Sequence, residues 1–121
     1  MIMEHALVIL VCLPLAGLGL RSMFAPAGIA KTMSIAPDGS AGLNTVRGVL
    51  GGLFLACVSM LALGVAMGEH LWFLSVAIVM GVIAFGRLVG IVADGFDRAV
   101  VPPLVVEVLF ASVLVSAYLL A

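Results

Sequence analysis

This sequence has few charged residues. Only 9% of its 121 residues are charged, with five Lys or Arg and six Asp or Glu, whereas an ordinary soluble domain has about 25% charged residues. The few charges are scattered, so the chain offers neither a basic patch for nucleic acid nor a polybasic tail for anionic lipid. We therefore expect no nucleic-acid partner.

Cysteine and histidine are also scarce. Cys12 and Cys57 stand alone in apolar runs, without a CxxC pair or the Cys/His spacing of zinc sites. His5 and His70 are expected at helix ends and lack the ligand set that a metal site needs. No nucleophile is paired with a base among the few polar residues. The sequence predicts no metal and no resident cofactor, and it argues against autonomous catalysis.

Apolar residues, in contrast, make up 65% of the chain and form long runs. A transmembrane helix needs about 20 such residues, so this length accommodates four spans with short connections. We predict an all-α fold, an integral membrane four-helix bundle that forms one domain over residues 1–121. Its helices are expected at about residues 5–23, 45–67, 71–93 and 102–120.

The first apolar run resembles the core of a signal peptide, but its flanks do not. Glu4 and no Lys or Arg precede it, and Arg21 stands where a cleavage site is expected. We interpret this run as the first membrane helix. The positive residues fall near the two longer loops, which places these loops in the cytoplasm and both termini on the outer side of the membrane. These residues are Arg21, Lys31, Arg47, Arg87 and Arg98.

Arg87 interrupts the third apolar run, where it is the only charge in residues 71–93. A charged side chain at hydrocarbon depth costs several kcal/mol unless it is paired or wetted. Antiparallel spans bring its candidate partners to one depth, roughly 5–10 Å below the same membrane face. The predicted charge cluster consists of Asn44, Arg47, Arg87, Asp94 and Glu107.

The cluster has two main interpretations. It could be a paired network that fixes how the second, third and fourth helices dock. It could instead be a polar site near the cytoplasmic face that binds a quinone, a lipid headgroup or a small anion, with arginines as anchors and Glu107 as proton acceptor or counter-ion. In a third interpretation, Arg87 extends to the interface alone.

Glycines recur at helical spacing in the second and third runs. Gly48 and Gly52 form a GxxxG face, and Gly86 and Gly90 belong to a stripe of small residues. We expect them to serve packing within the bundle. The predicted helix-packing glycines are Gly48, Gly51, Gly52, Gly86 and Gly90.

Three motifs carry a family resemblance: NTVRGVLGG at 44–52, GRLVGIVADG at 86–95, and the later Glu107. With four spans of this length, the chain resembles the DoxX-like group of small bacterial membrane proteins. Within that group it is most similar to an uncharacterised domain family with the pattern R-G-x-x-G-G, then G-R with a downstream D-G, then a membrane Glu. The better-known relatives serve as membrane subunits of quinone-linked or redox-associated complexes, or as assembly factors.

Three functions are compatible with these observations. The first is a non-enzymatic accessory or binding subunit, whose partners would be membrane lipid, another membrane protein or a second copy of the chain. The second is the membrane subunit of a quinone-linked oxidoreductase, with quinone as the cofactor. The third is a minimal oligomeric transporter, although arginines beside Glu107 would disfavour proton uptake there.

Overall fold

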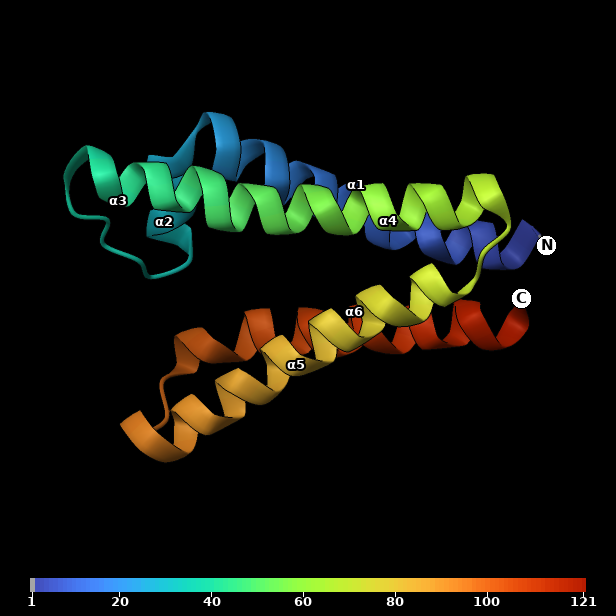
Figure 1. Ribbon diagram of the computed structural model, residues 1–121. Coiled ribbons are helices and arrows are strands. Elements are labelled where there is room, and N and C mark those ends of the chain that lie inside the picture. Colours follow the sequence, from blue (N-terminus) through green and yellow to red (C-terminus); the bar gives the residue numbers. More distant parts are fainter. Residues whose placement is uncertain (1) are drawn as a thin grey trace. The chain divides into compact units, whose positions relative to one another are not determined.

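The computed structural model describes residues 2–121, and these residues form helices without a β-strand (Figure 1). In chain order the elements are α1 (Ile2–Phe24), α2 (Pro26–Thr32), α3 (Gly39–Thr45), the π-helix η1 (Val46–Gly51), α4 (Gly52–Met67), α5 (Leu71–Asp94), the 3₁₀-helix η2 (Arg98–Val100) and α6 (Val101–Leu120).

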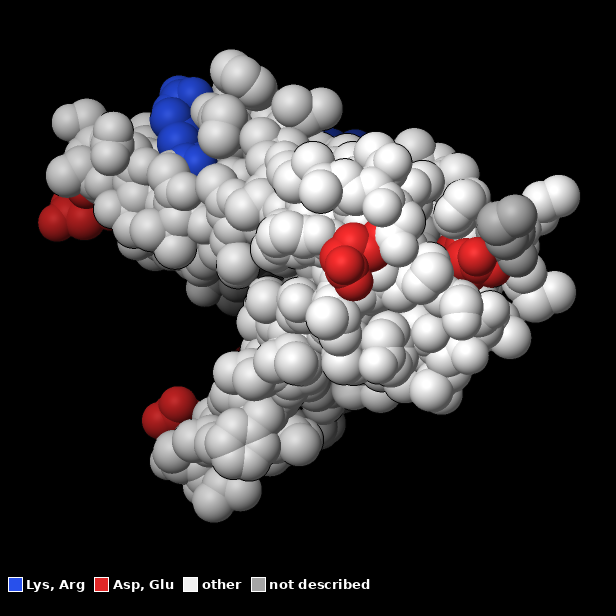
Figure 2. All heavy atoms as spheres, turned by 45° about the vertical axis from the view of Figure 1, so that its right-hand side comes forward, with Lys and Arg blue, Asp and Glu red and all other residues white. Residues whose placement is uncertain are grey.

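Four stretches are long and apolar enough to cross a membrane: Ile2–Phe24, Gly39–Met67, Leu71–Asp94 and Arg98–Leu120. Large apolar side chains such as Val92 and Leu119 are exposed along them, as expected where lipid replaces water. Figure 2 shows that charged side chains are few and scattered on the face that it displays. The predicted all-α membrane fold is confirmed.

The second span starts at Gly39, earlier than the expected residue 45, and two short helices occupy the segment predicted to be a long loop. Two turn-forming residues there begin these helices. Pro26 is in the first turn of α2, where a missing N–H costs no helical hydrogen bond. Gly39 begins α3 with φ +62°, a value that glycine adopts without strain.

The described chain divides into two compact units. The first contains the residues up to Val11 together with Leu63–Ala121. Within it α5 packs along α6 (Figure 1), and α5 buries one stripe of its surface at helical spacing. The buried residues of α5 are Phe73, Val76, Ala77, Met80 and Ala84.

The second unit comprises Cys12–Ala62. A small core of Ile29, Ala30 and Val46 lies under its short helices. The end of α1 comes very close to η1, because a Cβ built on Gly51 would lie 3.1 Å from the backbone nitrogen of Met23. The absence of a side chain at Gly51 is therefore what permits this contact.

Substitution of Gly51 tests this contact. We expect Gly51→Val to lower the free energy of unfolding by about 1–3 kcal/mol, the usual cost of overpacking. Gly52→Val is the matched control, since a Cβ at Gly52 meets nothing within 4 Å. Both can be measured by denaturant titration in detergent, followed by circular dichroism. Equal losses in the two variants would show that the close approach at Gly51 does not matter.

Candidate functional site

Arg47 lies in η1 and contacts the end of α1. Its Nη1 donates a hydrogen bond to the backbone oxygen of Met23 at 2.6 Å. Met23 is in the last turn of α1, where carbonyl groups lack helical partners and a positive charge is favourable. Arg47 therefore caps α1. It binds Met23, the residue whose backbone also lies close to Gly51.

Asn44, the other predicted member from this region, is exposed on α3. Both Asn44 and Arg47 belong to the second unit. Their participation in a cluster with Arg87 stays a prediction.

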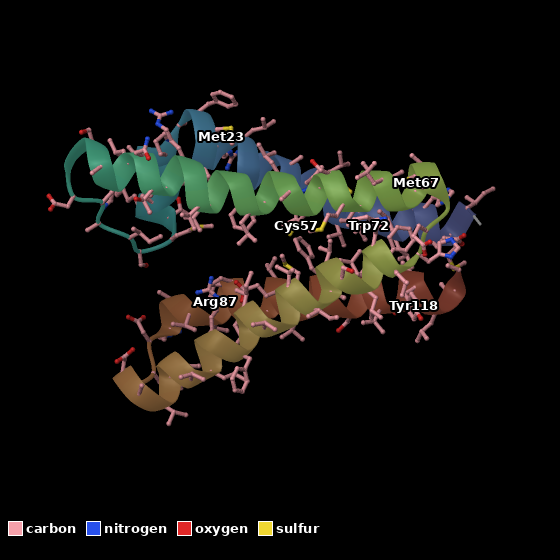
Figure 3. All side chains as sticks on the ribbon, in the orientation of Figure 1. Met23, Cys57, Met67, Trp72, Arg87 and Tyr118 are labelled. Carbon is pink, nitrogen blue, oxygen red and sulfur yellow. The ribbon has the colours of Figure 1, made fainter. Side chains whose placement is uncertain are left out.

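Arg87 and Glu107 form an ion pair that joins α5 to α6. The Nε of Arg87 donates to both carboxylate oxygens of Glu107, each at 2.8 Å. Figure 3 shows Arg87 projecting from α5 toward α6. The two side chains are largely covered, with exposed fractions of 32% for Arg87 and 13% for Glu107. Apolar helices surround this pair with few other polar groups, which strengthens their attraction.

Helix geometry explains why these two residues meet. Arg87 precedes the last residue of α5, Asp94, by about 10 Å at 1.5 Å per residue. Glu107 follows the first residue of α6, Val101, by about 9 Å. Since α5 and α6 run in opposite directions and pack together, the two charges lie at a similar depth.

The terminal amino groups of Arg87 are not used by this pair. An arginine has N–H donors on Nε and on both terminal nitrogens, but within residues 2–121 only Nε finds an acceptor. The Nη1 and Nη2 groups thus keep their full capacity to donate. They are available to a carboxylate, a phosphate or water.

A groove of about 520 Å³ opens beside Arg87 in the first unit. Asp94, the last residue of α5, lines the same groove as Arg87. The groove is lined by Ile83, Gly86, Arg87, Gly90, Ile91, Asp94, Gly95, Asp97 and Val100. A Cβ at Gly86 or Gly90 would meet nothing within 4 Å, and the same holds for Gly48. The two α5 glycines therefore leave the wall of the groove open.

Asp97 is a lining residue that the sequence reasoning did not include in the cluster. Its Oδ1 accepts from the backbone N–H of Ala99 at 2.9 Å and so caps η2. The Asp94–Gly95 pair is a turn signal in the sequence. A chain that reverses there returns toward the end of the same helix, which would bring Asp97 near Asp94. The apolar lining residues Ile83 and Ile91 could have been found by their spacing of four from Arg87.

The polar groups that line the groove come from three charged side chains. Its lining contains one guanidinium and two carboxylates, without Ser, Cys, His or Lys. Among residues 2–121 no group of three or more His, Cys, Asp or Glu is arranged to hold a metal ion. This arrangement suits recognition of a polar or charged group next to an apolar body.

Together these features describe a small all-α, multi-pass membrane protein with a groove along α5 that contains three charged side chains. Residues 3–118 match the family described as "Domain of unknown function (DUF4345)", and the chain belongs to that family. The predicted membership in an uncharacterised domain family is thereby confirmed. No curated protein and no solved structure matches the chain.

A double-mutant cycle tests the ion pair. Arg87→Leu and Glu107→Leu each leave one charge unpaired among apolar groups, so we expect each to lower the unfolding free energy by about 1–3 kcal/mol. The double variant removes both charges and should recover most of that loss. Unfolding in detergent measures all three variants. Strictly additive losses would contradict a coupled pair.

Proposed function

We propose that this protein binds the polar part of a membrane amphiphile in the groove beside Arg87, which α5, the following turn and η2 line, as a non-enzymatic accessory or binding protein. One observation carries the proposal. Arg87 lines the groove, contacts Glu107 through Nε alone, and has no acceptor for its terminal amino groups within residues 2–121.

The main rival is a purely structural ion pair between α5 and α6. An arginine that serves only to hold a carboxylate usually offers two parallel N–H groups, one to each oxygen. Here a single Nε–H is shared by both oxygens of Glu107. This geometry holds the guanidinium in place and leaves its outer edge for another acceptor, which favours a ligand.

The apolar surroundings support an amphiphile over a soluble solute. α5 and α6 are long enough to span a bilayer, and Arg87 lies about 10 Å from the helix end. A lipid or quinone already in the membrane has an apolar body that stays in contact with the hydrocarbon while its polar part enters the groove. A small anion from water would have to lose its hydration shell.

Location and partners follow as parts of the same proposal. The bias of Lys and Arg toward the longer loops supports an orientation with the groove on the cytoplasmic side and both termini outside, on the periplasmic side. The resemblance to the DoxX-like group supports a bacterial inner membrane. Membrane lipid is the first partner that we propose. A membrane-protein partner and a second copy of the chain stay predictions.

A quinone-linked oxidoreductase subunit is the second candidate. The resemblance to the DoxX-like group supports it, and a quinone would bring the redox chemistry that the lining side chains lack. Carbonyl oxygens of a quinone are acceptors that the terminal amino groups of Arg87 could serve. The two candidates differ in the molecule that is bound.

Native mass spectrometry of gently extracted protein tests the proposal. We expect the wild type to carry a lipid or a quinone. Arg87→Gln should retain about tenfold less of it, because a hydrogen bond to a charged group contributes about 1.5–3 kcal/mol. The control Arg21→Gln removes an exposed arginine of α1 and should retain the molecule. Solvent extraction of the same samples identifies it.

A folding defect must be separated from a binding defect. Arg87→Gln leaves Glu107 unpaired, so the variant Arg87→Gln/Glu107→Gln, which leaves no lone charge, is measured beside it. Loss of the molecule from the folded double variant supports the site. Wild type that carries no molecule, or a double variant that retains it fully, would show that the pair is structural.

A further inference from the structure

The charges that line the groove do not balance. Arg87 is already neutralised by Glu107. Asp94 and Asp97 also line the groove, and neither forms an ion pair with another residue in 2–121. A purely anionic ligand could accept hydrogen bonds from the amino groups of Arg87. The carboxylates of Asp94 and Asp97 would repel it.

Asp94 occupies an electrostatically unfavourable position. It is the last residue of α5, and the last turn of this helix holds no basic residue. The C-terminal end of a helix carries partial negative charge, so a carboxylate there is disfavoured. A cation at this end of the groove would relieve that repulsion.

Asp97 is a second carboxylate of the groove that a cation could neutralise. One of its oxygens accepts from the N–H of Ala99, which fixes the side chain beside the end of α5. Its second oxygen stays available. The chain turns at Gly95, with φ +95°, so Asp94 at the end of α5 and Asp97 before η2 both line the groove next to this turn.

The donor groups of Arg87 and the carboxylates of Asp94 and Asp97 occupy different positions along the helix axis. Arg87 precedes the end of α5 by about 10 Å, whereas Asp94 is the last residue of that helix and Asp97 follows the turn. In a phospholipid such as phosphatidylethanolamine, the phosphate lies next to the acyl region and a primary ammonium follows it toward water. That order matches the order of the charges in the groove.

We infer that the groove recognises a phospholipid headgroup in which a phosphate is followed by a primary ammonium, as in phosphatidylethanolamine. The terminal amino groups of Arg87 bind the phosphate, for which a guanidinium offers two parallel donors. Asp94 and Asp97 accept from the ammonium. Gly86 and Gly90, which carry no side chain into this space, let the headgroup approach the backbone of α5. The inference rests on the proposed function and specifies its ligand.

Other membrane amphiphiles satisfy only part of this arrangement. Phosphatidylglycerol supplies a phosphate but no cation for the carboxylates. Phosphatidylcholine supplies a cation without N–H donors, so it cannot hydrogen-bond to Asp94 and Asp97. A quinone supplies neither charge.

The test is competition among lipids. Purified protein is reconstituted into nanodiscs with equal amounts of phosphatidylethanolamine, phosphatidylcholine and phosphatidylglycerol, and the lipids that stay bound are counted by native mass spectrometry. We expect about tenfold enrichment of phosphatidylethanolamine over either competitor, the value of one hydrogen bond to a charged group. Asp94→Asn/Asp97→Asn should abolish this preference while lipid retention through Arg87 persists.

The double Asn variant isolates charge from structure. Asparagine caps helices as well as aspartate does, so η2 should stay intact. Asp38→Asn, which removes one exposed charge before α3, is the control and should keep the preference. Preferential retention of phosphatidylglycerol, or an unchanged preference in Asp94→Asn/Asp97→Asn, overturns this inference but leaves the proposed function standing. Wild type that retains none of the three lipids overturns the inference, and if it also carries no quinone it overturns the proposed function.

Discussion

The ion pair between Arg87 and Glu107 is the constraint on which the first unit depends. An arginine in an apolar helix must be compensated, and Glu107 supplies that compensation from α6 at 2.8 Å. The pair fixes the register of α5 against α6, because a shift of either helix by one turn would separate the charges by about 5.4 Å. The groove at the end of these helices follows from the same register.

The second unit is organised around Met23. Arg47 donates to its carbonyl, and Gly51 makes room for its backbone. Both residues belong to the π-helix η1, an element that is rare in proteins and usually short. The R-G-x-x-G-G motif thus contains a helix cap and a close contact four residues apart. Its physical task is to hold the end of α1.

The second motif has a different task. Gly86, Arg87, Asp94 and Gly95, the letters of G-R and D-G, all line the groove. Arginine brings donors, the glycines leave space or end the helix, and aspartate brings negative charge to the helix end. A chain with so few charged residues places three of them around this one groove. That concentration distinguishes the groove from the rest of the apolar surface and makes ligand recognition a reasonable role for it.

The sequence by itself determined the fold class, because apolar runs of about 20 residues permit little but membrane helices. It also determined that Arg87 needs a partner and made Glu107 a candidate, since helix rise alone places the two at one depth. Only the tertiary structure decided how they meet: through Nε alone, with the terminal amino groups left beside a groove. Periodicity could reveal neither the π-helix that brings Arg47 to Met23 nor the turn that adds Asp97 to the groove. Both depend on backbone geometry and on contacts between residues distant in sequence or across a turn.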